Sequence, residues 1–271
     1  MVEENEAHHL AELKENGLES DGGRHKIACF LGSEAANYKT NLTLKLNHTQ
    51  FYPSSYAMPK EAARFEKGKL NEYFYRFFHS KNYLDMSTRK NPMWIYKPKN
   101  DYGGSGCHVY DIRMPQFQEV IKRDCEKRRN FVLQRYIENP LLIGGYKFHM
   151  RIFLLLTSMN PPCGYLHRGG QVLFSTKKYS YDHSTLGANF DKYAHLTNWS
   201  IHSLPENYDR LLAKKDVIGV GCEWRFKRLL RHLKKEHPNF SETDMWNQLS
   251  NIGTKTLNAI IRYENRMIHA P

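Results

Sequence analysis

The sequence lacks paired cysteines and long apolar runs. Its five cysteines are an odd number and include no Cys-x-x-Cys pair, so neither a disulfide framework nor a zinc knuckle is predicted, and a reducing compartment is the simplest interpretation. The longest strongly apolar run, residues 152–156, is far shorter than the roughly 20 residues that a membrane helix needs. Residues 1–26 lack the apolar core of a secretory signal. We therefore expect a soluble cytoplasmic protein with no membrane partner.

Internal repeats and low-complexity tracts are also missing. An apolar content of 40% with 13% aromatic residues excludes wholesale disorder, and 271 residues suffice for one large domain or two small ones. Residues 1–26 are predicted to be a flexible polar segment and residues 27–271 to form the folded part. The formal net charge of +12 attracts polyanions, which include nucleic acid, an anionic membrane or an acidic protein surface. Nucleic acid is disfavoured because no recognised DNA- or RNA-reading motif accompanies the charge.

Short β-rich runs in the middle of the chain are typical of sheet strands. They are bounded by Pro, Gly or Asn and cover residues 94–96, 131–133, 152–156 and 171–174. A helical period follows from Gly221, with apolar faces on residues 224–233 and 246–260 and a Ser241-x-x-Asp244 start signal before the second of these. Residues 60–79 are also predicted to be helical. Strands followed by helices predict an α+β layered fold.

The first candidate site combines a lysine with a glycine loop. Lys97 ends one predicted strand, and Gly103-Gly104-Ser105-Gly106 leads into the next. An ammonium and several backbone N–H groups placed in this way could surround a phosphate. The loop is not a Walker motif, since no Gly-Lys-Ser/Thr follows, and in a protein kinase the glycine loop would precede the lysine. A plain hairpin turn explains the loop, taken alone, equally well.

Basic residues alternate with apolar ones over residues 147–152. In a strand, Lys147, His149 and Arg151 lie on one face and the apolar residues between them lie on the other. The apolar run over 152–156 predicts burial on both faces. Cations next to a buried strand need an anionic partner, so ligand binding is favoured over a solvated charged face.

Two further segments carry little weight when taken singly. Residues 164–170 are predicted to be a strand that leads into an arginine and a turn, and Arg168 alone is typical of a surface arginine. Thr197-Asn198, before Trp199-Ser200, is by itself typical of a turn or helix cap. None of the 14 histidines belongs to a His-Glu-x-x-His pair, so no metal site is predicted.

In combination and in order, these motifs resemble the tubulin tyrosine ligase-like family. The resemblance runs from about Phe51 to nearly the C-terminus. It rests on residues 51–59, 94–106, 134–140, 147–151, 168–169 and 195–198, and residues 221–224 look like a helix start of the polyglutamylase branch. The resemblance implies an ATP-grasp-like fold of mixed sheets flanked by helices, with the nucleotide between two α+β lobes.

The resemblance also implies roles for the candidate residues. ATP would contact Lys97, Ser105, Gly106, Gln134, Arg135, Tyr136, Ile137, Lys147, His149, Thr197 and Asn198. Arg151 would orient the acceptor, Arg168 would serve the γ-phosphate or the incoming amino acid, and Trp199 and Ser200 would lie near that amino acid. The implied reaction phosphorylates a glutamate side chain to an acyl phosphate, which the amine of a free amino acid then attacks.

The implied partners are tubulin tails, ATP, Mg²⁺ and a free amino acid. Glutamate is the expected amino acid, with glycine and tyrosine left open, and the acidic tails would be steered to a basic face. The implied location is the cytoplasm and cytoskeleton, with the cilium or basal body as a further place. A non-catalytic member that binds microtubules or a polyglutamylase complex through its basic face is the alternative.

The chain departs from the family pattern at three places. His149 stands where the family has Asp in Lys-Phe-Asp-Leu-Arg, and Gly103 and Ser105 stand where many members have basic residues. The family's magnesium ligands, an Asp and a Glu-x-Asn element, would follow Pro271. We therefore expect a domain truncated at its C-terminus that is inactive or binds nucleotide at best.

Overall fold

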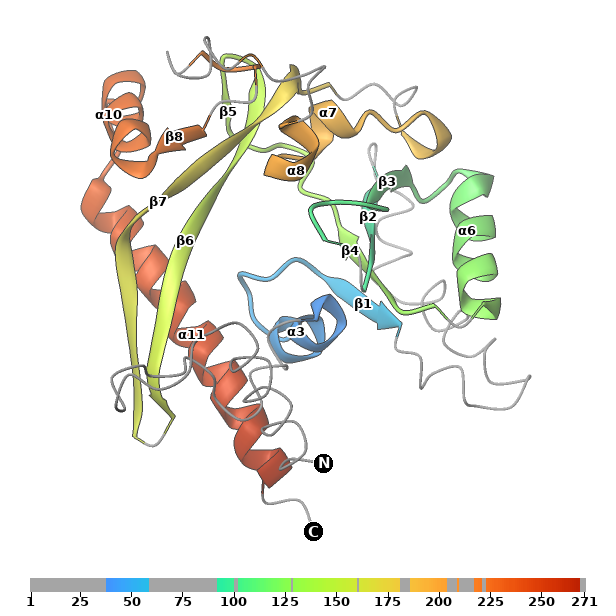
Figure 1. Ribbon diagram of the computed structural model, residues 1–271, viewed down its shortest axis with the longest axis horizontal. Helices are drawn as coiled ribbons and strands as arrows, with labels where there is room; N and C mark the ends of the chain where they lie inside the picture. The colour runs from blue at the N-terminus through green and yellow to red at the C-terminus, as the bar shows by residue number, and fades with distance from the viewer. Residues whose placement is uncertain are drawn as a thin grey trace, which may run out of the picture. The chain divides into compact units, whose positions relative to one another are not determined.

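The computed structural model describes residues 38–58, 92–99, 102–127, 129–159, 161–180, 186–203, 209, 217–220 and 223–268. By its internal contacts the chain divides into residues 1–34 and 35–271, and every described residue belongs to the second unit. The described part of this unit consists of two four-stranded antiparallel sheets with helices (Figure 1). The predicted α+β fold class is confirmed. The helix predicted over residues 60–79 lies outside the described residues.

The first sheet has the strand order β1-β4-β2-β3. Its strands are β1 (Ser55–Met58), β2 (Met93–Pro98), β3 (His108–Asp111) and β4 (Phe131–Arg135). Helix α3 (Lys39–Leu46) packs on β1 and β4. On one face, Trp94 and Tyr96 share a core with Phe117 of helix α6 (Pro115–Glu126).

The segment 186–203 packs on the opposite face of the first sheet. It contains the short helices η3 (Gly187–Asn189), α7 (Lys192–His195) and α8 (Trp199–His202). Met93 and Ile95 of β2 share a core with Leu196 of this segment. Lys97 lies on the same face of β2, because alternate residues of a strand share a face. The fold therefore directs a cation toward the region that this segment borders.

The second sheet has the strand order β5-β6-β7-β8. Its strands are β5 (Leu142–Ile143), β6 (Tyr146–Met159), β7 (Pro162–Lys178) and β8 (Glu223–Arg225). Helices α10 (Phe226–Glu236) and α11 (Glu242–Ile268) follow, and α11 lies along the long β6–β7 hairpin (Figure 1). Val172, Phe174 and Trp224 are buried against these helices.

The closing helices confirm the helical period predicted for this part of the chain. The Ser241 hydroxyl accepts a hydrogen bond from the Asp244 backbone N–H at 3.1 Å, so the predicted start signal is a helix cap. The helix start predicted at residues 221–224 is wrong where it is described. Trp224 pairs with Val172 in a strand, and α10 begins two residues later. The indole fills the core beneath the sheet, and this packing outweighs the helical period.

The prediction that residues 152–156 are buried on both faces is wrong. The side chains of Phe153 and Leu155 are 51% and 57% exposed, whereas Ile152 and Leu154 are half-buried. The exposure alternates because the helices cover one face of the hairpin. Apolar residues on its other face therefore stay in contact with solvent.

The turn predicted at Gly169–Gly170 is also wrong, because β7 continues through this pair. The β6–β7 register shifts there, so that β7 bulges between the pairs made by Ile152 and Leu154. A Cβ atom on Gly170 would lie 2.6 Å from the carbonyl oxygen of Arg151. The glycine therefore permits a close approach of the two backbones rather than a chain reversal.

The described cysteines Cys107, Cys125 and Cys163 are free thiols. Burial raises the pKa of Cys125 to about 11, so it stays protonated. In the described part of the chain, no helix is long and apolar enough to cross a membrane.

Candidate functional site

Lys97 is the first member of a hydrogen-bonded polar chain on the first sheet. Its Nζ donates a hydrogen bond to Gln134 Oε1 at 2.6 Å, and Gln134 Nε2 donates to Ser55 Oγ at 2.9 Å. Ser55 lies opposite Gln134 in the β1–β4 register, so both side chains share a face. Burial lowers the pKa of Lys97, the nearby Lys39 lowers it further, and the Cys107 thiol has an opposing effect. The ammonium thus lies in a desolvated and already cationic place.

Lys147 approaches from the second sheet. Its Nζ donates to the Tyr136 hydroxyl at 2.7 Å and to the His195 carbonyl oxygen at 2.9 Å, and it lies 4.4 Å from the centroid of the Tyr136 ring. Burial, followed by the charge of Lys97, lowers the pKa of Lys147 to about 8. Among the described residues, no carboxylate lies within ion-pair distance of Lys97 or Lys147. Two partly buried cations therefore face one site, as an anionic ligand would require.

His149 and Thr197 form the next contact on the same face of β6. His149 Nδ1 and Thr197 Oγ1 are 2.6 Å apart. Lys147 and His149 are two residues apart, and their partners His195 and Thr197 are also two residues apart. The site face of β6 is therefore matched to this segment residue by residue.

The glycine loop contacts the segment that follows Thr197. The Ser200 hydroxyl donates to the carbonyl oxygen of Gly103 at 2.9 Å. Gly104 has a φ of +87°, and a Cβ atom there would lie 2.8 Å from Asn198 Oδ1. The loop joins the antiparallel strands β2 and β3, so the hairpin interpretation is correct for its backbone. A phosphate contact by Ser105 and Gly106, which are both exposed, stays a prediction.

The remaining predicted residues are less closely gathered. Arg168 is exposed, and its guanidinium lies 5.7 Å from the centroid of the Trp246 ring of α11, on the face of the second sheet that the helices cover. The structure does not bring it to Lys147. Ile137 is 60% exposed and Trp199 is 42% exposed. The roles implied for these residues stay predictions.

Arg135 and Arg151 lie at the edges of the cluster. Arg135 is half-buried at the end of β4, next to the buried Tyr136. Arg151 is exposed and follows Lys147 and His149 on the site face of β6. Of the two, only Arg151 shares a strand face with the site lysine of the second sheet.

Four residues of the cluster were not assigned a role from the sequence. Ser55 reaches Gln134 only through long-range pairing, and the Ser175 hydroxyl accepts from the Lys147 backbone N–H at 3.1 Å. His195 and Tyr179 pack edge to face at a centroid distance of 5.3 Å. His195 precedes Leu196-Thr197-Asn198, and this position in a candidate motif is the signal that could have identified it.

The described part of the site contains ammonium, amide and hydroxyl groups. In the residues that the structure describes, no group of three or more His, Cys, Asp or Glu side chains is arranged to hold a metal ion. The ammonium groups fit an anionic ligand, and the amide and hydroxyl groups of the protein lie near it.

Residues 27–270 match the family described as the Tubulin-tyrosine ligase family. The chain belongs to this family. The resemblance stated from the motifs is thereby confirmed, and with it the ATP-grasp-like α+β fold. Several proteins similar to this chain are named tubulin polyglutamylases or monoglutamylases.

The probable tubulin polyglutamylase TTLL2 of Homo sapiens is 34% identical over 185 residues, which are 68% of this chain and 26% of that protein. The probable tubulin polyglutamylase ttll-9 of Caenorhabditis elegans is 29% identical over 215 residues, 78% of this chain and 44% of that protein. The tubulin monoglutamylase TTLL4 of Homo sapiens is 28% identical over 260 residues, 92% of this chain and 19% of that protein. The chain therefore spans less than half the length of each of these relatives.

Proposed function

We propose that residues 27–271 are the ATP-grasp domain of a ligase that uses ATP to add glutamate to glutamate side chains of tubulin tails. The observation that carries this proposal is the pair Lys97 and Lys147, which face one site from two sheets without a described carboxylate partner. Membership of the tubulin-tyrosine ligase family and the names of the similar glutamylases support the choice of reaction. Cytoskeletal association follows from the same proposal.

The lysine pair fits ATP as an anionic ligand. Removing two ammonium groups from water is costly unless an anion compensates them, and phosphate oxygens are strong acceptors for charge-assisted hydrogen bonds. We assign Lys97 and the Ser105-Gly106 turn to the phosphates, and Lys147 to the adenosine side. The described side chains do not fit Mg²⁺ by themselves, because this ion prefers carboxylate oxygens.

The nucleotide base and ribose would lie along the contacts between the sheets. Gln134 and Arg135 end β4, an inner strand of the first sheet, and Tyr136 and Ile137 follow it. We assign these four residues to the adenine. His149 of β6 and Thr197 and Asn198 of the segment 186–203 follow, and their imidazole, hydroxyl and amide groups suit the ribose and phosphate oxygens. These assignments agree with the order of the motifs along the chain.

ATP supplies the phosphoryl group that activates the acceptor carboxylate as an acyl phosphate. In this proposal Lys97 stabilises negative charge at the phosphates, and its bond to Gln134 fixes its direction. Arg151 orients the acceptor from the solvent end of the same face of β6. Arg168 is assigned to the γ-phosphate or the amino acid, and Trp199-Ser200 to the amino acid.

The first test is calorimetric titration of ATP with Mg²⁺ into the chain. Lys97→Met should weaken binding by about 100-fold, because a hydrogen bond to a charged group contributes about 1.5–3 kcal/mol. Lys122→Met is the matched control, since Lys122 is an exposed lysine on α6. Saturable binding that is lost only in the first variant supports the assignment.

A second assay follows incorporation of labelled glutamate into tubulin in the presence of ATP, with glycine and tyrosine as competing donors. A folded chain that binds no ATP would contradict the proposal. Sedimentation with microtubules regardless of ATP, reduced by salt, would then favour the alternative of a non-catalytic member that binds through its basic surface.

A further inference from the structure

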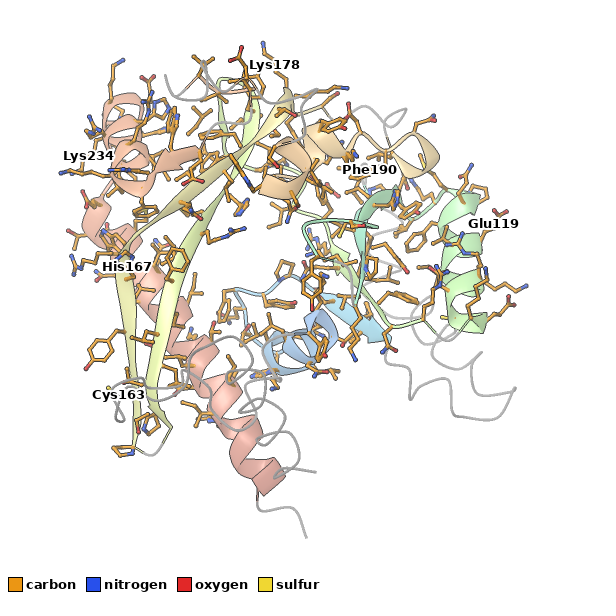
Figure 2. All side chains as sticks on the ribbon, in the orientation of Figure 1. Glu119, Cys163, His167, Lys178, Phe190 and Lys234 are labelled. Atoms are coloured by element: carbon orange, nitrogen blue, oxygen red, sulfur yellow. The ribbon has the colours of Figure 1, made fainter. Side chains whose placement is uncertain are left out.

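His195 has a side chain that is 1% exposed and enclosed by aromatic rings. The ring centroids of Tyr136, Tyr179 and Phe190, the last labelled in Figure 2, lie 5.8, 5.3 and 5.5 Å from that of the imidazole. This packing fixes the direction of both ring nitrogens. The buried Nε2 has no hydrogen-bond partner in the part of the chain that is described. A buried group kept at this cost needs an explanation.

The other nitrogen, Nδ1, faces the Tyr136 hydroxyl at 3.1 Å. The Tyr136 oxygen already accepts from Lys147 Nζ at 2.7 Å, because an ammonium can only donate. The Tyr136 hydroxyl also forms a side-chain hydrogen bond with Tyr179, so Lys147, His195 and Tyr179 together fix its position. A chain of contacts therefore links the Lys147 ammonium, the Tyr136 hydroxyl and Nδ1 of the His195 imidazole.

The same residue also holds the Lys147 ammonium directly. The His195 carbonyl oxygen accepts from Nζ at 2.9 Å. Lys147 has three N–H donors, and the described residues use two of them, one on the His195 carbonyl oxygen and one on the Tyr136 hydroxyl that His195 contacts. The direction of the third N–H is thereby determined.

We propose that His195 is a positioning residue that, through Tyr136, directs the remaining N–H of Lys147 toward the ligand. The inference rests on the proposed function only for the identity of that ligand as ATP. Burial, followed by the charge of Lys147, lowers the pKa of His195 to about 4, while Asp191 has an opposing effect. Burial also raises the pKa of Tyr136 and of Tyr179, so all three rings are neutral near pH 7.

The test measures Lys147 in the protein without nucleotide. The rate of Lys147 acylation is followed against pH by peptide mass spectrometry, since only the neutral amine reacts. Tyr136→Phe removes the hydroxyl and keeps the ring, and it should lower the midpoint by about one pH unit because the ammonium loses an acceptor. His195→Leu should shift the midpoint in the same direction, whereas His195→Asn keeps a polar group near the place of Nδ1 and should restore it.

The same variants are then titrated with ATP. Affinity should fall about tenfold in Tyr136→Phe and His195→Leu and return in His195→Asn. Unchanged acylation profiles in folded Tyr136→Phe and His195→Leu would overturn the proposal. Equal effects of His195→Leu and His195→Asn would assign His195 a packing role only and would also overturn it. If the unmodified chain binds no ATP, the proposed function fails, while the acylation profiles still decide the role of His195.

Discussion

The two halves of the β6–β7 hairpin are continuous in backbone but differ in what covers them. The inner half comprises residues 146–152 and 170–178, and the outer half comprises residues 153–159 and 162–168. In the inner half, helices cover one face and α7 and α8 contact the other. In the outer half, Phe153, Leu155 and Tyr165 are 51%, 57% and 62% exposed, and Figure 2 shows Cys163 and His167 along it.

The covering of the second strand face decides where the polar side chains of an alternating strand form a site. Both halves alternate between a face toward the helices and a second face. Among the described residues, only those at the inner half form a second layer, and there Lys147 and His149 are partly desolvated and hydrogen-bonded to Tyr136, His195 and Thr197. Desolvation strengthens electrostatic interactions, so the chemistry gathers where two layers enclose the polar face.

The largest expected effect separates the two halves by stability. Phe174→Ala removes a buried ring that packs on Trp224 at a centroid distance of 4.9 Å, and it should lower the free energy of unfolding by about 3–5 kcal/mol. Phe153→Ala in the outer half should change it by about 0.5 kcal/mol. Urea denaturation of both variants checks this, and equal losses would show that the outer half is packed as tightly.

The next effect separates two cations on one face of β6. Lys147→Met should weaken ATP binding by about 10- to 100-fold, because charge-assisted hydrogen bonds contribute about 1.5–3 kcal/mol. Arg151→Met, at an exposed position, should change the affinity by about threefold or less, since exposed ion pairs contribute about 0–1 kcal/mol. Calorimetry of both variants is the measurement, and a reversed order would place the ligand toward the outer half.

A pH effect should follow from the covering of the inner half. The pKa of His195 is about 4 in the folded chain and 6.5 ordinarily. Between these pH values the imidazole is protonated in the unfolded chain and neutral in the folded chain. The stability from the neutral imidazole is complete above about pH 6.5 and is lost as the pH falls toward about 4. Between pH 7 and 5 the loss should be about 2 kcal/mol.

Chemical denaturation at both pH values gives this number. His195→Asn removes the titrating group, so its decline should be smaller by the same amount. An identical decline in both proteins would assign the pH effect to other groups.

The smallest effect concerns the exposed apolar residues. Leu155→Ser should change the free energy of unfolding by about 0.5 kcal/mol or less, because its side chain is 57% exposed. Thermal unfolding checks this. A loss of about 2 kcal/mol or more would mean that a layer covers the outer half in solution.

The sequence predicted the elements with strong local signals. The runs at 94–96, 131–133 and 171–174 are strands, and the Ser241 start signal precedes a helix, because β-rich composition and capping act over a few residues. The motifs also predicted that Lys97, Gln134, Lys147, His149 and Thr197 belong to one site. In the structure these residues lie close together.

Features set by distant neighbours could not be predicted in this way. The apolar run at 152–156 does not reveal that helices cover one face only, and alternation cannot locate the bulge after Leu166 that precedes Gly170. The contact between Ser55 and Gln134 joins residues 79 positions apart, and a single sequence carries no sign of that pairing. The sheet face on which Arg168 lies could not be predicted either, because Arg168 lies within this bulge.

The matched spacing of Lys147 and His149 against His195 and Thr197 links assembly to binding. If β6 paired one residue out of place, both side chains would turn toward the helices and lose their partners together. Such a chain would keep its strands and helices and have no site. A ligand that binds only the chain with correctly paired β6 would stabilise that form and shift the equilibrium away from chains with slipped pairing.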